Sequence, residues 1–258
     1  MSVEINVFLL CYNESPLLPQ TVKHYKKYFP SCKITIYDNE STDTSVELAK
    51  SHGCNVVSWS SGDKIDDYKY REIKNNCWKT IESGWIIMAD MDEFLCITEA
   101  DLMEEMKKGV TILKTTGKDM VGESNTLDLS DIDLQTIVKY VDNNYMSKNV
   151  CFLREKIIEM NYDIGAHFCE PCGLVEYSQQ FYVIKHMSNL GLNFIINKMT
   201  QRYNRSRDMR SENIAYHYTD DLDTIVTGYI KLLNESKIMP MTDGTITYDS
   251  IMNASQEV

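Results

Sequence analysis

Apolar and polar residues alternate in blocks along the first hundred residues. Four short apolar runs, rich in β-branched and aromatic residues, are separated by longer segments with helical spacing. Short apolar runs bounded by turn residues are typical of buried strands. We therefore expect strands at 3–10, 33–37, 54–59 and 85–89.

Helices are expected between these strands. Ser15 followed by Pro16 combines a capping residue with proline at the first helical position, which is typical of a helix start, and this helix should reach about residue 28. The next helix should end near Gly53. The third, with apolar residues every four positions, should end at Gly84.

This βαβαβαβ order predicts a parallel sheet with right-handed crossovers. In such a sheet the loops after the strands lie along one edge, outside the carboxyl ends of the strands, and ligands bind there. Carboxylates gather in the segments expected at that edge, 12–14, 38–40, 60–63 and 90–93. The pattern therefore predicts one polar, acidic ligand-binding edge.

Beyond Phe94 the pattern changes to one typical of a mixed or antiparallel sheet. The last ~15 residues are expected to fray. The expected elements are a helix at 98–108, strands at 110–115, 149–154, 156–160 and 181–186, helices at 190–203 and 221–235, and a polar region of weak periodicity at 117–147.

Composition and charge fit one globular domain with a C-terminal helical extension. The chain has 258 residues, with 26 basic and 38 acidic side chains, a formal charge of −12, and 43% apolar residues. This is enough apolar material for a sizeable core, and α/β folds often use this length as one unit. Because so acidic a chain repels a polyphosphate backbone, general nucleic-acid binding is not expected.

No targeting or membrane segment is expected. The N-terminus has Glu4 and no basic residue before a short apolar run, and no run approaches the ~18 apolar residues of a membrane-spanning helix. Most of the eight cysteines lie in apolar segments, which is typical of reduced, buried thiols. The prediction is a cytoplasmic protein.

The most informative string is WIIMADMDEFL, residues 85–95. A buried strand ending in Asp90 and Asp92 would present both carboxylates on one side of the extended chain. Two such oxygen ligands can hold Mg²⁺ or Mn²⁺ and leave coordination positions for a diphosphate. The metal would also offset the repulsion between an acidic edge and an anionic ligand. For an isolated Asp-x-Asp pair, the alternative is a solvated acidic turn.

Several strings in the same order resemble a known family. VFLLCYNE, IYDNESTD and MADMDEF are similar to the nucleotide-binding half of family 2 glycosyltransferases with the GT-A fold, especially the subgroup whose motif reads Asp-x-Asp-Glu-Phe and which is related to family 92. The similarity continues in GKDMVGE, GAHFCEPCG, VIKHMSNLGLNFIINK and RYNRSRDMRSENIAYHY, so that it spans about residues 3–218.

The resemblance implies a GT-A type, Rossmann-like mixed α/β sheet flanked by helices. Residues 1–218 would form the glycosyltransferase domain, with 1–96 as the nucleotide-sugar-binding half and 97–218 as the acceptor-binding half. Residues 219–258 would form a helix and tail packed on the same domain. The implied activity is transfer of a sugar, of the hexosyltransferase type, from a nucleoside diphosphate sugar to a hydroxyl acceptor on a glycan or other glycoconjugate. The donor is expected to be a UDP-sugar and the cofactor Mn²⁺ or Mg²⁺, which would stabilise charge on the departing diphosphate.

The resemblance also implies roles for individual residues. A late histidine would be a further metal ligand: His186, expected at the end of a strand and before a helix, fits that place, and His167 is the alternative. The residues implied at the donor are Tyr12, Asn13 and Glu14 beside the nucleotide, Asp38 near the base, Arg71 near the base or diphosphate, Asp90 near the ribose or metal, and Asp92 on the metal.

One basic stretch stands out in this acidic chain. Guanidinium groups bind phosphate oxygens bidentately, so part of this stretch, Arg202 included, is a candidate for holding the donor diphosphate. The alternative is a surface helix paired with acidic neighbours. The stretch comprises Lys198, Arg202, Arg205, Arg207 and Arg210 and is the only local counterweight expected for the acidic edge.

A transfer that inverts the anomeric centre needs a carboxylate to take the acceptor proton. Asp119 and Glu170 are the first candidates for this base, and Glu123 and Asp163 are further candidates. Each of the four could instead be a surface charge. The stereochemistry is left open. Residues 117–147 are expected to form the acceptor wall, because this region is polar, rich in loops and follows the metal-binding strand.

Other readings stay open. Cys169 and Cys172, with His167, could supply half of a zinc site, although no second close pair provides the remaining ligands. A sugar-phosphate nucleotidyltransferase would use a similar sheet and metal but normally carries a Gly-rich, basic loop where this chain has CYNESP. A non-catalytic nucleotide-sugar-binding module is disfavoured because the carboxylate pair is intact.

Overall fold

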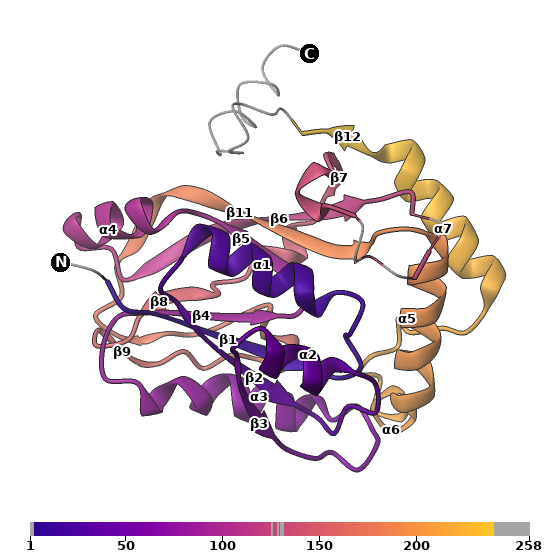
Figure 1. Cartoon of the computed structure of the whole chain (residues 1–258), viewed down its shortest axis with the longest axis horizontal. Helices are drawn as coiled ribbons and strands as arrows, with labels where there is room; N and C mark the ends of the chain where they lie inside the picture. Colours follow the sequence, from indigo (N-terminus) through magenta and orange to yellow (C-terminus); the bar gives the residue numbers. More distant parts are fainter. Residues whose placement is uncertain (1–2, 125, 128, 130–131, 240–258) are drawn as a thin grey trace.

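The computed structural model of the chain describes residues 3–124, 126–127, 129 and 132–239. The expected mixed α/β architecture is confirmed, with a central sheet flanked by helices (Figure 1). β1 (Ile5–Cys11) pairs in parallel with β2 (Lys33–Asp38) and β4 (Trp85–Asp90), and β3 (Asn55–Ser58) pairs in parallel with β2. The parallel sheet predicted from the first hundred residues therefore has the order β3-β2-β1-β4.

The crossovers are α1 (Leu18–Tyr28), α2 (Ser45–Ser51) and α3 (Asp67–Asn76), and α3 continues into the 3₁₀ turn η1 (Cys77–Thr80). The helix start predicted at Ser15 is early. The carbonyl of Glu14 accepts the backbone N–H groups of both residues 17 and 18, so a turn precedes the first helical residue.

Helices cover both faces of this sheet, and every residue of β1 is buried. Val7 and Leu9 lie in a core with side chains of α1 and α2, whereas Phe8 and Leu10 lie in a second core with Trp78 of η1. Successive side chains of a strand point to opposite faces, so a continuous apolar run is what a sheet covered on both faces requires.

The second half of the chain adds mixed strands. β5 (Glu93–Cys96) follows β4 directly, and α4 (Glu99–Lys107) has a capping box made by Thr98 and Asp101. The central strands of this half are β6 (Ile112–Val121) and β11 (Tyr177–Asn189), which run parallel to each other, while β11 is antiparallel to β5. β7 (Lys139–Asp142) and β8 (Cys151–Leu153) are antiparallel to β6, and β8 is also antiparallel to β4.

The structure corrects the polar region predicted at 117–147. β6 continues to Val121 because β11 pairs with it over most of its length, and β7 also falls inside this region. The smaller elements are the 3₁₀ turns η2 (Leu134–Thr136), η3 (Asn144–Met146) and η4 (Ile164–Ala166), the two-stranded ladder of β9 (Ile157–Glu159) and β10 (Cys172–Gly173), and β12 (Lys237–Ile238) beside β7.

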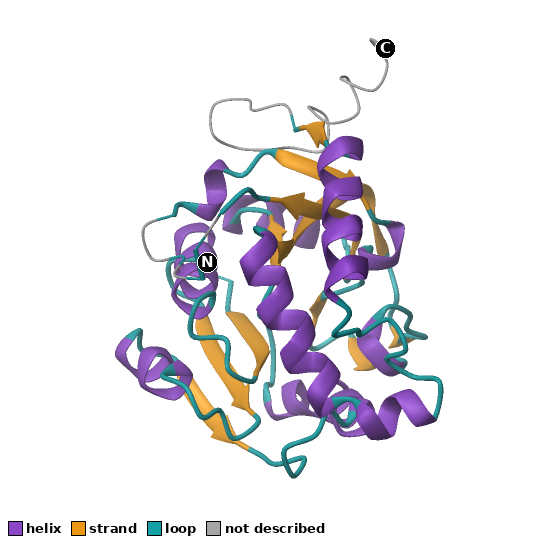
Figure 2. Ribbon diagram, turned by 90° about the vertical axis from the view of Figure 1, so that its right-hand side faces the viewer, coloured by secondary structure: helices purple, strands orange, loops and turns teal. Residues whose placement is uncertain are grey.

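Three helices end the described chain: α5 (Leu192–Arg205), α6 (Arg207–Ser211) and α7 (Leu222–Glu235). Figures 1 and 2 show α5 and α7 side by side at one end of the sheet. Ile195 of α5 packs with Tyr229 of α7, and the Tyr229 hydroxyl donates to the carbonyl of Gly122, 2.7 Å away. The expected C-terminal helix therefore packs against α5 and the end of β6 in a separate cluster. The tail predicted to fray lies outside the described residues.

Between residues 3 and 239, leaving aside the undescribed positions, no helix has both the length and the apolar character needed to cross a membrane.

Candidate functional site

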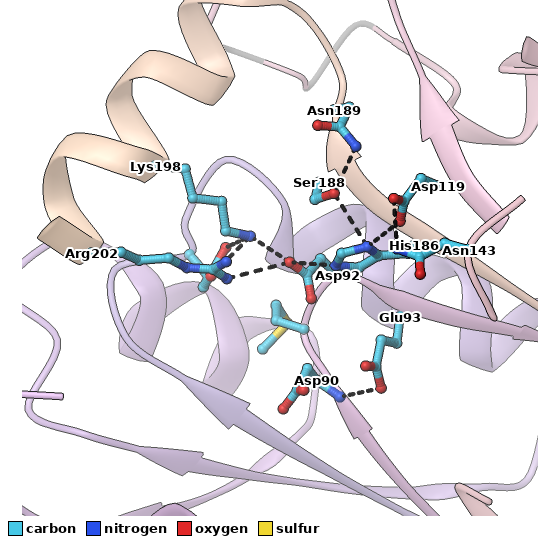
Figure 3. Close-up of polar contacts among 12 residues, drawn as sticks. Asp90, Asp92, Glu93, Asp119, Asn143, His186, Ser188, Asn189, Lys198 and Arg202 are labelled. Carbon is cyan, nitrogen blue, oxygen red and sulfur yellow. Dashed lines mark hydrogen bonds and ion pairs between the residues drawn. The ribbon is translucent and has the colours of Figure 1, made fainter. Parts of the chain in front are cut away.

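The predicted Asp-x-Asp motif occupies the turn between β4 and β5. β4 ends at Asp90, the chain turns through Met91 and Asp92, and β5 begins at Glu93. Figure 3 shows the Asp92 carboxylate reaching His186, Lys198 and Arg202, while the backbone N–H of Asp90 reaches Glu93. The two carboxylates therefore have different ion-pair partners, because the two-residue alternation of side chains holds only while the chain stays extended.

Asp92 is the centre of a buried charge cluster. Only 3% of the residue is exposed, and its Oδ2 lies 2.8 Å from Nζ of Lys198, 3.4 Å from Nη2 of Arg202 and 3.6 Å from Nε2 of His186. Burial alone would raise the pKa of Asp92, but the Lys198 ammonium and the His186 ring outweigh burial and hold it well below its usual value. The carboxylate is therefore ionised.

The basic stretch on α5 supplies the cations. Lys198 and Arg202 are four residues apart, so they lie on one face of the helix and reach the same carboxylate. Lys198 also pairs with Glu14 at 3.3 Å. One turn later, the Arg205 guanidinium lies over the ring of Tyr12, 3.2 Å from its centroid. The positions of Lys198, Arg202 and Arg205 are consistent with the prediction that this part of the stretch faces the ligand-binding edge.

His186 is oriented by neighbouring strands. On β11 it lies opposite Glu93 of β5 and Asp119 of β6, and its Nδ1 donates to Asp119 Oδ1 at 2.7 Å. The other oxygen of Asp119 accepts the side-chain amide of Asn143 at 2.8 Å. Burial would lower the pKa of His186, but Asp92 and Asp119 raise it to about 9. With Nδ1 held in this way, Nε2 faces Asp92.

Asp90 is held by two lysines that the sequence analysis missed. Its carboxylate oxygens lie 2.7 Å from Nζ of Lys74 and 3.1 Å from Nζ of Lys148, and Lys148 also pairs with Glu93 at 2.6 Å. Burial raises the pKa of Asp90, but the two ammonium groups outweigh it and lower the pKa. The backbone N–H of Asp90 donates to Glu93 at 3.0 Å, which closes the turn.

One signal could have identified Lys74. It lies on the same predicted helix as Arg71, about one turn later and between apolar positions, and it is 4% exposed. The expectation for Arg71 is not supported, because its guanidinium lies over the exposed ring of Tyr68, 5.5 Å from the centroid. Lys148 carries no sequence signal, since only the pairing of β8 with β4 brings it close to Asp90.

The net charge of the ion pairs at this edge differs from the excess negative charge that the sequence predicted there. The ion pairs join four carboxylates to four cations, so their net charge is 4 − 4 = 0. The stretch from Lys198 to Arg210 is therefore not the only source of positive charge for these carboxylates. Their charge balance alone does not require a metal. The carboxylates are Glu14, Asp90, Asp92 and Glu93, and the cations are Lys74, Lys148, Lys198 and Arg202.

The donor set for a divalent metal is narrower than expected. Asp92 and His186 present a carboxylate oxygen and an oriented ring nitrogen to each other, so a divalent metal that displaced the proton on His186 Nε2 and took its other ligands from water and phosphate would fit between them. Asp90 points to its lysines instead. Among the described residues, no group of three or more His, Cys, Asp or Glu side chains is arranged to hold a metal.

The alternative histidine lies elsewhere. His167 Nδ1 is 2.8 Å from the carbonyl of Tyr145, and its ring stacks on the Tyr145 ring. Its neighbour Cys169 accepts the side-chain amide of Asn149, and Cys172 is exposed.

The residues expected at the nucleotide lie after β1 and β2. Asn13 Oδ1 accepts the backbone N–H of Thr42 at 2.7 Å, so this side chain holds the loop after β2. Asp38 is 3% exposed; its Oδ2 accepts the Ser41 N–H, while its buried Oδ1 has no hydrogen-bond partner in the described part of the chain. Burial raises the pKa of Glu14 even though Lys198 opposes it.

Of the four carboxylates considered as a base, Asp119 alone contacts His186. Glu170 is exposed and pairs with Asn161 through its backbone. Glu123 pairs with Lys139 at the surface. Asp163 accepts the backbone N–H of the next residue at the start of η4.

Comparisons with known proteins give limited similarities. No family model matches the chain. Protein RfbJ of Shigella flexneri is 33% identical over 57 residues, which cover 22% of this chain and 44% of that protein. The match therefore spans less than half of that relative.

Two solved structures have partial similarity. Residues 1–349 of S. aureus TarS give a TM-score of 0.45 at 10% identity, covering 89% of this chain and 71% of that one. Glucosyl-3-phosphoglycerate synthase from Mycobacterium tuberculosis, in complex with Mn²⁺, UDP and glucosyl-3-phosphoglycerate, gives 0.32 at 16% identity, covering 45% and 44%. These values leave the function to be argued from the site.

Proposed function

We propose that the protein is a GT-A type glycosyltransferase that transfers a sugar from a nucleoside diphosphate sugar to a hydroxyl group. One observation carries the proposal: buried, ionised Asp92 lies at the carboxyl end of β4 and faces His186, Lys198 and Arg202. Ligands of parallel α/β sheets bind at this edge, and an oriented carboxylate beside cations suits an anionic leaving group.

The donor is proposed to lie along this edge as a UDP-sugar. Asp38 Oδ1 is a buried acceptor without a partner in the described chain, and a base N–H would satisfy it. Lys198 and Arg202 would meet the diphosphate, because both already lie beside Asp92 and a guanidinium binds phosphate oxygens bidentately. To bind an anion here, Lys198 and Arg202 would have to contact the phosphate oxygens as well as their present carboxylate partners.

Asp92 and His186 are the residues that would hold Mn²⁺ or Mg²⁺. When bound, such an ion stabilises negative charge on the leaving diphosphate. Asp119 is proposed as a positioning residue: it holds His186 Nδ1, which leaves Nε2 directed at the same space as the Asp92 carboxylate. Lys74 and Lys148 lower the pKa of Asp90, and Lys148 also pairs with Glu93, so the two lysines hold the turn that presents Asp92.

The acceptor is proposed to be a hydroxyl group of a glycan or glycoconjugate, and the enzyme to be of the hexosyltransferase type. The division into a donor half, 1–96, and an acceptor half, 97–218, is also proposed. Asp38 and Asp92 lie in the first half, whereas His186, Lys198 and Arg202 reach the proposed donor site from the second, so the boundary between the two halves would run through this site. A cytoplasmic location remains part of this proposal.

The decisive experiment measures nucleoside diphosphate release from a panel of nucleotide sugars, with Mn²⁺, Mg²⁺ or a chelator. The native chain should release nucleotide from at least one donor only with metal, and Asp92→Asn should lose at least ~100-fold in rate. Asp223→Asn, an exposed carboxylate on α7, is the matched control and should keep full activity. Full activity of Asp92→Asn in the presence of chelator would falsify the proposal. Pyrophosphate release from a nucleoside triphosphate and a sugar phosphate would favour a nucleotidyltransferase instead.

A further inference from the structure

Three aromatic side chains form a surface cluster that we call the aromatic platform: the exposed Tyr145 and Phe168 and the half-buried His167. The Tyr145 and His167 rings stack with centroids 3.7 Å apart and planes inclined by 26°, and Phe168 stands at 75° to Tyr145, 6.2 Å away. Tyr145 remains 58% exposed and Phe168 68% exposed. Side chains this apolar rarely gather at the surface without a partner, so the cluster indicates a binding surface.

The platform lies beside the candidate site because contacts on both sides of Tyr145 tie it there. Two residues before it, Asn143 donates to Asp119, which holds His186. Three residues after it, Lys148 pairs with Asp90. Tyr145 is therefore held between two side chains that contact the carboxylates of the site.

The backbone under His167 is shaped to bring the two rings together. Gly165 has φ 76° and Ala166 has φ 56°, so two consecutive residues adopt left-handed conformations. A Cβ atom on Gly165 would lie 2.6 Å from Cδ2 of His167. Left-handed conformations at non-glycine residues are uncommon and persist where surrounding structure determines them, often at ligand sites.

The aromatic platform lies on the side of the turn between β4 and β5 where we propose that the acceptor binds. η3 follows β7 and packs on β6, where the Asn143 N–H donates to the carbonyl of Gly117 at 3.1 Å. In the sheet, β6 and β8 lie on one side of β4, whereas β1 and β2, with Asp38, lie on the other. A donor whose base reaches Asp38 would leave the platform free.

Aromatic faces are negative and apolar, and a pyranose ring presents a face of weakly positive C–H groups with hydroxyl groups around its rim. Ligand sites commonly combine aromatic walls with a few polar groups. Here the nearby polar side chains are those of Asp119 and Asn143.

We propose that the aromatic platform binds a pyranose ring of the acceptor glycan and so directs an acceptor hydroxyl group toward the Asp92–His186 site. This inference rests on the proposed function for its direction, but sugar binding to the platform does not depend on turnover. The two can therefore fail separately.

The test measures sugar binding to the full chain without donor or metal, by saturation-transfer NMR. The probes are maltose, cellobiose, lactose, chitobiose and mannobiose at millimolar concentration. The native chain should bind at least one, Tyr145→Ala should weaken that binding at least ~10-fold, and Tyr145→Phe should retain it because the ring is kept. Gly165→Ala, which displaces His167 without removing an aromatic group, should also weaken binding. Circular dichroism would confirm folding.

Tyr216→Ala is the matched control, because Tyr216 is 78% exposed and its ring contact is with His217 and not with a platform residue. It should leave sugar binding unchanged. The platform is overturned if no probe binds the native chain, or if the bound probe keeps its affinity in Tyr145→Ala. A Tyr145→Ala variant that raises the donor KM and leaves the acceptor KM unchanged would also overturn it. Sugar binding that depends on Tyr145 in a chain that never consumes a donor would instead refute the proposed function alone.

Discussion

Asp119 Oδ1 lies 2.7 Å from Nδ1 of His186, and this contact aims the other ring nitrogen at Asp92, 3.6 Å away. β6 and β11 are parallel neighbours, and their register places the two residues directly opposite each other. The imidazole is therefore oriented by the sheet and not by its own loop.

Asp119→Asn should weaken Mn²⁺ binding and nucleotide-sugar turnover by roughly 10–100-fold, because an amide holds the imidazole less firmly than a carboxylate does. Calorimetric titration with Mn²⁺ and a donor-turnover assay would measure the two effects. Glu123→Gln is the matched control, since this nearby carboxylate pairs with Lys139 at the surface. Equal Mn²⁺ affinity in both variants would show that Asp119 does not position the ligand.

Lys148→Met should destabilise the protein by about 3–5 kcal/mol, because it leaves the buried carboxylate of Glu93 without its cation. Lys33→Met removes an exposed pair with Glu4 and should cost no more than about 1 kcal/mol. Urea unfolding monitored by tryptophan fluorescence would measure both. Similar midpoints for the two variants would mean that the buried ion pairs of the turn contribute little to stability.

Gly117→Ala should destabilise by about 1–3 kcal/mol, since the new Cβ would lie 2.5 Å from the Asn143 carbonyl oxygen and force η3 away from β6. Because Asn143 also contacts Asp119, donor turnover should fall as well. Gly228→Ala is the control, as this glycine lies within α7 with open space around it. Thermal unfolding should show the control unchanged or up to about 1 kcal/mol more stable. A Gly117→Ala variant as stable as the native chain would exclude the close contact.

Stability should depend on pH through His24. Its Nε2 donates to the Leu95 carbonyl at 2.9 Å and its Nδ1 accepts the Gln135 amide at 3.1 Å, so the neutral ring is fully paired. Burial lowers the pKa of His24 to about 3. Between the unfolded value near 6.5 and about 3, the unfolded chain binds the proton and the native chain does not, so stability falls as pH falls.

At pH 4.5 this effect should amount to about 2.7 kcal/mol, because pH 4.5 lies about two units below the unfolded pKa near 6.5 and each unit contributes about 1.36 kcal/mol. Urea unfolding of the native chain and of His24→Gln at pH 7 and pH 4.5 would isolate it, because the variant lacks the titrating ring while other groups are shared. Equal losses in the two proteins would show that His24 is not kept neutral by the fold.

The part of the site proposed to bind the donor could be predicted largely from the local pattern of apolar and polar residues. The strand at 85–89, the carboxylates after it and the edge they share with Asp38 are consequences of alternating apolar runs and helical segments, which local propensity and burial govern. His186 is singled out by the family resemblance and not by this pattern, and it lies inside β11 instead of at the strand end predicted for it. The local pattern failed at residues 117–121, because polar residues there are held in β6 by pairing with β11.

By itself the sequence determined the alternation of strands and helices in the first hundred residues, the acidic turn after β4 and the basic face of the helix that carries Lys198 and Arg202, since each depends on neighbours within a few residues. Tertiary structure decided which charges meet. Lys74 and Lys148 neutralise Asp90, Asp119 aims His186, and Tyr145 stacks on His167 only because separate strands and turns converge there. Ion pairing and ring stacking act over a few ångströms of space, and sequence spacing does not encode that distance.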